Sequence, residues 1–136
     1  MKNMNKFFKH LLLLLPIVFL VGCGGSNPAN ILKKAAAEVN KTCPQRVDDI
    51  TVLTKVNYVD HCFTYYYELD PDEDSEAIMN ADYEVIRSVI SAMMKENAAN
   101  DSNVQSFVNH LRQDNARLVH HYAMKDGRSR DVEVDY

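Results

Sequence analysis

The chain has 136 residues, 46% hydrophobic and 25% charged, with a formal net charge of −4 at pH 7. This length suffices for one domain of ordinary size but not for two. Three of the fifteen Lys and Arg residues precede Cys23, whereas all nineteen acidic residues follow it. A chain that begins at Cys23 therefore carries 12 − 19, or −7 charges. Such an acidic balance argues against nucleic-acid binding, and its net charge offers no attraction to membrane phosphates.

The first 22 residues have the composition of a bacterial export signal. Three lysines precede an apolar run from Leu11 to Val21, which is about half of the ~20 residues that a spanning helix needs. The run ends in Leu20-Val21-Gly22-Cys23, which resembles the lipobox of bacterial lipoproteins. The resemblance implies that residues 1–22 are removed and that Cys23 carries covalent lipid. An ordinary secretory signal with a chance cysteine is the alternative.

Residues 23–29 are predicted to be the lipidated cysteine and a short linker. The stretch Gly24-Gly25-Ser26-Asn27-Pro28 cannot hold regular structure. Its reach is at most ~20 Å when extended, so a lipid anchor would keep the folded part close to the bilayer. Residues 30–136 then form a single domain, because no break in composition divides them.

The pattern of apolar residues predicts an α+β domain. Helical spacing of apolar residues predicts helices at about 30–42, 72–98 and 102–113. Alternation of apolar and polar residues predicts two hairpins, 47–59 with 62–70 and 115–125 with 128–136. The simplest arrangement is a four-stranded antiparallel sheet with the amphipathic helices on one face.

The register of the first hairpin follows from side-chain alternation. With Asp60-His61 as the turn, Tyr58 faces Phe63 and Val56 faces Tyr65. The same register extends the apolar face by placing Thr54 opposite Tyr67 and Val52 opposite Leu69. It also sets Cys62 beside the turn and Cys43 beyond the far end, roughly 40 Å away, so no disulfide between them is expected.

Two registers compete in the second hairpin, which turns at Asp126-Gly127. A two-residue turn would place Asp131 opposite Tyr122. A three-residue loop, with Gly127 in a left-handed bulge position, places Val132 opposite His120. We favour the three-residue loop because it pairs apolar strand positions with each other.

No arrangement of residues indicates catalysis or metal binding. The four histidines after the signal lack the spacing of metal ligands, and adjacent His120 and His121 point to opposite faces of a strand. There is no Gly-x-Ser-x-Gly elbow. We expect no catalytic residue, no metal and no cofactor beyond the lipid on Cys23. One alternative is an envelope hydrolase or thiol enzyme that uses Cys62 or His120/His121.

A second alternative is a small-ligand or lipid pocket between sheet and helices, for which Met93, Met94 and Met124 would be adaptable lining residues. The most unusual local feature, however, is Tyr65-Tyr66-Tyr67. Tyr66 projects to the second face of the sheet, where Leu53 and Val59 are also expected, and these three residues could form a docking surface. The plainer interpretation is that aromatic residues favour strands.

One motif resembles a known group of proteins. Asn40-Lys41-x-Cys43-Pro44-x-x-Val47-Asp48-x-x-Thr51-x-Leu53, with a later Tyr-x-Tyr and a closing Tyr-x-x-x-Asp-Gly hairpin, resembles small uncharacterised bacterial envelope lipoproteins. The resemblance spans roughly residues 30–136 and brings no catalytic residues with it. The lipid anchor, the short tether, the acidic surface and the lack of a catalytic arrangement together favour a non-enzymatic, membrane-anchored module that binds another envelope protein or assists assembly. No acidic run follows Cys23. By analogy with the surface-export signals of some Gram-negative lipoproteins, this implies the periplasmic face of the outer membrane and not the cell surface.

Overall fold

Five strands form one sheet in the order β1-β2-β3-β4-β5, which confirms the α+β class. The computed structural model describes residues 27–136, so the predicted signal and Cys23 lie outside the described residues. Along the chain the elements are α2 (Pro28–Asn40), β1 (Gln45–Arg46), β2 (Thr51–Val59), β3 (Cys62–Leu69), α3 (Glu73–Asn80), α4 (Tyr83–Asn100), α5 (Ser102–Asp114), β4 (Arg117–Met124) and β5 (Ser129–Val134).

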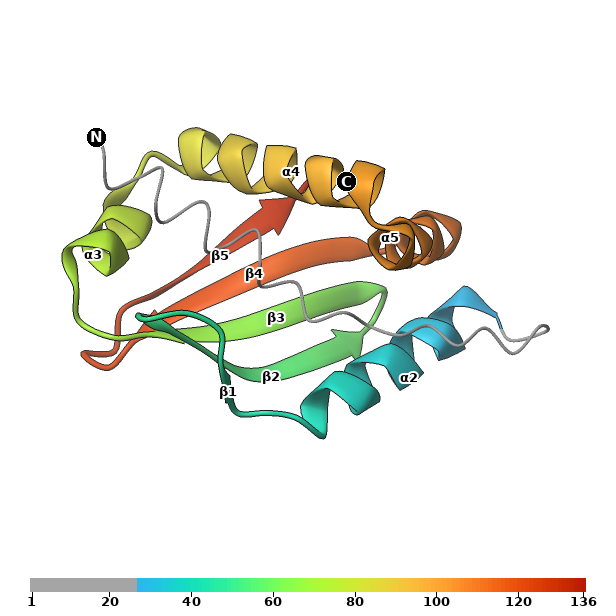
Figure 1. Ribbon diagram of the computed structural model, residues 1–136, viewed down its shortest axis with the longest axis horizontal. Coiled ribbons are helices and arrows are strands. Elements are labelled where there is room, and N and C mark those ends of the chain that lie inside the picture. Colours follow the sequence, from blue (N-terminus) through green and yellow to red (C-terminus); the bar gives the residue numbers. More distant parts are fainter. Residues whose placement is uncertain (1–26) are drawn as a thin grey trace.

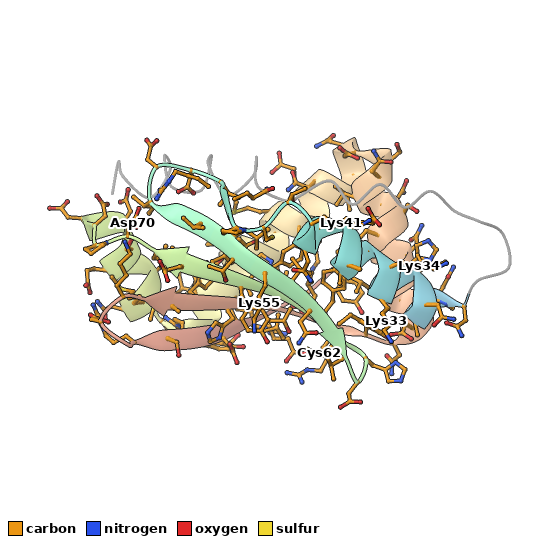
Figure 2. The ribbon with its side chains drawn as sticks, turned by 90° about the horizontal axis from the view of Figure 1, so that it is seen from below. Lys33, Lys34, Lys41, Lys55, Cys62 and Asp70 are labelled. Atoms are coloured by element: carbon orange, nitrogen blue, oxygen red, sulfur yellow. The ribbon has the colours of Figure 1, made fainter. Side chains whose placement is uncertain are left out.

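The strands run side by side, with α2 beside the β2 end of the sheet and α4 beside the β5 end (Figure 1). Seen after a quarter turn, the helices lie on one side of the sheet (Figure 2). The helix α2 begins with the Asn27 side chain accepting from the backbone of Asn30 at 2.9 Å, and with Pro28 in its first turn. This helix then buries a stripe of Leu32, Ala35, Ala36 and Val39.

The expectation of an all-antiparallel sheet is wrong, because β3 and β4 pair in parallel. After Leu69 the chain crosses the sheet through α3, α4 and α5 and returns to the end where β3 began. There the backbone N–H of Arg117 donates to the carbonyl of His61 at 2.8 Å. A crossover that carries helices over one face suits parallel pairing, whereas stacking two hairpins would have needed no crossover. The short strand β1 adds a fifth member that the sequence pattern did not predict.

The single helix expected at 72–98 is also wrong, since the chain breaks between α3 and α4. Ala81 and Asp82 leave the helical region, and the Asp82 carboxylate accepts from the backbone N–H groups of Glu84 and Val85 at 3.0 and 3.4 Å. Asp82 therefore starts a new helix as its N-cap. Val85, in the first turn of α4, is 53% exposed.

Arg130 of β5 holds the break in place. Its Nη1 donates to the carbonyl oxygens of Ile78, Met79 and Ala81 at 3.0, 3.1 and 2.8 Å. These carbonyls belong to the last turn of α3 and the residue after it, where no intrahelical donor is left. The cation thereby satisfies the helix end and fixes it to the sheet.

A bulge shifts the register of the first hairpin. Tyr58 pairs with Phe63 and Val56 with Tyr65, as predicted, but the register slips between Leu53 and Lys55. Beyond that point Leu53 pairs with Tyr67 instead of Thr54, and Thr51 pairs with Leu69 instead of Val52. One extra residue in β2 exchanges the faces of every residue before it.

The second hairpin has the predicted three-residue loop. Val132 pairs with His120 and Val134 with Leu118. Gly127 has φ +95, a backbone conformation that glycine adopts without steric cost, and its N–H donates to the carbonyl of Met124 at 3.0 Å. The register therefore places Val132 and Val134 on the helix-facing side of β5, together with Arg130.

Side chains close parts of both outer edges of the sheet. The amide of Asn40 bonds to both backbone groups of Val56, with Nδ2 to the carbonyl at 2.6 Å and Oδ1 to the N–H at 2.7 Å. On the opposite edge, the Glu133 N–H donates to the Tyr83 hydroxyl at 3.3 Å, and its carbonyl accepts from Arg87 at 3.1 Å. Such edge groups would otherwise be available to pair with another strand.

Replacing Arg130 by Met should destabilise the fold by about 2 kcal/mol, because three carbonyls lose a charged donor. Urea unfolding followed by far-UV circular dichroism measures the change. Lys95→Met, which removes an exposed lysine from α4, is the matched control and should leave the midpoint nearly unchanged. Equal midpoints for the two variants would contradict the role assigned to Arg130.

Candidate functional site

The side of the sheet turned away from the helices is called the open face. Alternation and register place there the outward residues of β2 to β5: Val52, Lys55, Asn57, Val59, Cys62, Thr64, Tyr66, Glu68, Arg117, Val119, His121, Ala123, Ser129, Asp131 and Glu133. Most are exposed or half-buried, whereas the residues between them on β3 are buried. Figure 2 shows two of them, Lys55 and Cys62, on the side of the sheet away from the helices.

A row of four interacting side chains crosses the middle of the open face. The Lys55 ammonium lies 4.4 Å from the centre of the Tyr66 ring, and the Tyr66 and His121 rings are 5.2 Å apart. His121 Nδ1 is 2.5 Å from an Asp131 carboxylate oxygen. Each residue comes from a different strand, and the registers of β2 to β5 set them in line. The row combines a cation, an aromatic ring, an imidazole and a carboxylate on a rigid support.

Only part of the predicted docking surface lies on the open face. Tyr66 is half-buried there, and Val59 is 53% exposed. Leu53 is 0% exposed and belongs to the core, because the bulge before Lys55 turns it inward. Lys55, not Leu53, lies at the centre of the open face. The parallel pairing of β3 with β4 places His121 on the same face. Neither the bulge nor that pairing left a signal that alternation alone could detect.

The candidate enzyme residues are not brought together. Cys62 lies opposite Arg117, whereas His121 lies opposite Tyr66, four residues farther along the strands. At ~3.3 Å per residue the two positions are roughly 13 Å apart, beyond the reach of proton transfer. The Cys62 sulfur instead lies 3.6 Å from the Thr64 hydroxyl. Cys43 and Cys62 are both free.

His120 faces the core. It is 4% exposed, and its ring centre lies 5.5 Å from that of Tyr65 and 5.4 Å from that of Tyr67. Its Nδ1 is 3.3 Å from the Tyr122 hydroxyl, and Nε2 has no hydrogen-bond partner. Burial lowers the pKa of His120 to about 4, so the imidazole is neutral at pH 7.

A second histidine stabilises the turn of the first hairpin. His61 Nδ1 lies 3.0 Å from one oxygen of Asp114, whose side chain is 6% exposed, and the Tyr58 hydroxyl donates to the other oxygen. Burial, together with the Asp114 carboxylate, raises the pKa of Tyr58 to about 12. Asp114 is the last residue of α5, so this cluster ties the turn to the end of that helix.

The described residues contain neither a cluster of metal-binding side chains nor a membrane-spanning helix. Between residues 27 and 136, no group of three His, Cys, Asp or Glu side chains is placed to bind a metal ion. Over the same range, every helix is too short or too polar to cross a bilayer. Met93, Met94 and Met124, the suggested pocket residues, are all buried.

Comparison with known proteins identifies the family. Residues 27–129 match a family model described as a domain of unknown function, DUF8479. The chain belongs to the DUF8479 family. No curated protein matches this DUF8479 chain. The match starts at the first described residue and covers every element up to the start of β5, so it includes three of the four residues in the central row.

A solved structure resembles the DUF8479 fold. It is the crystal structure of a candidate secreted protein from Pseudomonas aeruginosa, with a TM-score of 0.55 and 13% sequence identity. The alignment covers 82% of this chain and 96% of that chain. At this identity the likeness shows a shared fold and nothing about activity.

Acid should destabilise the DUF8479 domain through His120. The unfolded histidine binds a proton below pH 6.5, whereas the buried one does so only below about 4, so stability falls as the pH drops through this interval. At about 1.4 kcal/mol per pH unit, the loss specific to His120 is about 3 kcal/mol.

Urea unfolding of the parent chain and of His120→Leu at pH 7 and pH 4 measures this loss. The stability of the variant should fall less with acid than that of the parent chain. The difference between the two pH dependences isolates His120 from the carboxylates, which both proteins share. Identical pH dependences would contradict a buried neutral imidazole.

Proposed function

We propose that this protein is a lipid-anchored envelope protein whose domain binds another envelope protein through the open face, without catalysis. The central row from Lys55 to Asp131 carries the proposal, because it places varied, partly exposed groups on a rigid sheet. Tyrosine, which Tyr66 supplies at the centre of this row, is enriched among the residues that carry most of the binding energy at protein interfaces.

The anchor rests on the sequence before the domain. Leu20-Val21-Gly22-Cys23 supplies the lipobox, and α2 starts five residues after Cys23. Two acyl chains or more hold a protein stably on a membrane, whereas a single chain holds it only marginally. The similar fold of a candidate secreted protein agrees with a role outside the cytoplasm. By the sequence after Cys23, the periplasmic face of the outer membrane is the proposed location.

A non-catalytic role is supported by the separation of the reactive side chains. The strand register separates the Cys62 thiol from His121 by four residues along the strands, and His120 is enclosed by tyrosines. His121 and Asp131 form a pair that could accept a proton. The strand register, however, places no serine or cysteine directly opposite His121. Binding therefore accounts for the open face better than chemistry does.

Acylation should depend on Cys23 and not on the other two cysteines. In a bacterial host fed labelled palmitate, the full chain should take up label, and Cys23→Ser should abolish it. Cys43→Ser and Cys62→Ser are matched controls that should keep the label, because both thiols lie within the folded domain. Label that persists in Cys23→Ser would refute the anchor.

Binding should be confined to the open face. A photo-crosslinking amino acid in place of Val59 should yield a discrete adduct with one envelope protein, whereas the same probe in place of the exposed Ser88 on α4 should not. Adding Tyr66→Ala and His121→Ala should lower the Val59 adduct more than fivefold, while circular dichroism shows a retained fold.

Two outcomes would contradict the binding surface. One is equal adduct formation from Val59 and Ser88, which would indicate non-specific encounters. The other is an adduct at Val59 whose yield is unchanged by the Tyr66 and His121 substitutions.

A further inference from the structure

The outward side of α2 carries a concentration of positive charge. Lys33, Lys34 and Lys41 are all exposed, and the buried stripe of the helix faces the other way. Lys41 pairs with Glu38 at 2.6 Å on the surface, and Glu38 is the only acidic residue of the helix. Within residues 27–136, Lys33 and Lys34 have no ion-pair partner.

The rest of the domain has the opposite charge. Residues 23–41 carry three lysines and one glutamate, which is +2, so residues 42–136 account for −7 − 2, or −9. The acidic residues include a group that follows β3, from Asp70 to Asp74. Figure 2 shows Asp70 at one end of the molecule and Lys33 and Lys34 at the other. The domain therefore has a charge asymmetry along its length that its net charge conceals.

The position of α2 in the chain indicates which end of the domain lies nearest to the membrane. Only four residues lie between Cys23 and Pro28, so the Cα atoms of these two residues are at most ~18 Å apart. If Cys23 is acylated, as proposed above, α2 is the element of the domain nearest to the bilayer. Lysines close to a membrane surface are attracted by anionic lipids, and acidic residues more than a Debye length away are screened.

We propose that the outward side of α2 is a membrane-contacting surface, in which Lys33, Lys34 and Lys41 lie against anionic phospholipid headgroups. This inference rests on the proposed anchor for its geometry, but it concerns the lipid surface and not the acyl chains. The contact orients the tethered domain with its acidic end away from the membrane. It also fixes the direction in which the open face is presented to a partner.

Vesicle binding by the unacylated full chain, made by cell-free synthesis, tests the surface without the anchor. The readout is the ratio of partition coefficients for vesicles with about 30% phosphatidylglycerol and for pure phosphatidylcholine, at about 50 mM salt. Residues 1–26 are the same in every variant, so their own binding cancels when variants are compared. Each lysine charge is worth about fivefold in the ratio.

The neutral pair Lys33→Gln/Lys34→Gln should lower the ratio by about 25-fold, and Lys33→Glu/Lys34→Glu, which reverses both charges, should lower it further. The matched control is Lys95→Glu/Lys125→Glu, which changes the net charge equally but on α4 and near Asp70. It should change the ratio less than twofold. Salt at about 500 mM should abolish the difference between the parent and the α2 variants.

Equal loss in the α2 and control variants would overturn the proposal, because net charge would then explain it. No loss in the α2 variants, with helix content retained in circular dichroism, would overturn it as well. Failure of palmitate labelling at Cys23 would instead remove the anchor, and it would leave the vesicle result unaffected.

Discussion

The parallel pairing of β3 with β4 is the constraint on which the rest of the structure depends. It requires a connection that carries the chain back along the sheet, and α3, α4 and α5 supply it while covering one face. The same pairing sets Tyr66 beside His121 on the other face and Tyr67 beside Tyr122 in the core. The central row and the aromatic core are thus two consequences of a single register.

The aromatic core shows how strongly that register is held. Phe63, Tyr65 and Tyr67 alternate inward along β3, with ring centres 5.4 and 6.2 Å apart, and Phe107 of α5 meets Phe63 edge-on at 4.9 Å. A slip of one residue would turn these rings outward and bury Thr64, Tyr66 and Glu68 instead. A polar imidazole is tolerated at His120 because it is neutral and its neighbours are aromatic.

Local patterns in the sequence predicted local structure well. Side-chain alternation identified the pairing of Tyr58 with Phe63, and the Asp126-Gly127 turn identified the second hairpin. Pairing between distant segments was not predictable in this way, because alternation is the same for parallel and antiparallel neighbours. The helix break at Asp82 is held by Arg130, which is far away in the chain. The bulge before Lys55 contains no residue type that requires a bulge, so the sequence gives no sign of it.

For the same reason the candidate site was only partly predictable. Tyr66 and Val59 follow from alternation close to the turn, where the register held. Leu53 lies beyond the bulge, so its expected face was wrong. His121 was singled out as a histidine, but its contacts with Tyr66 and Asp131 come from strands that the sequence could not align.

The amide of Asn40, which occupies the backbone groups of Val56, has a consequence for contacts between copies of this domain. An unblocked edge strand can pair with the edge of another sheet. A side-chain amide reproduces the hydrogen bonds of a neighbouring strand but offers no backbone for further extension. At Val56, Asn40 therefore occupies the position that a strand from a second molecule would need.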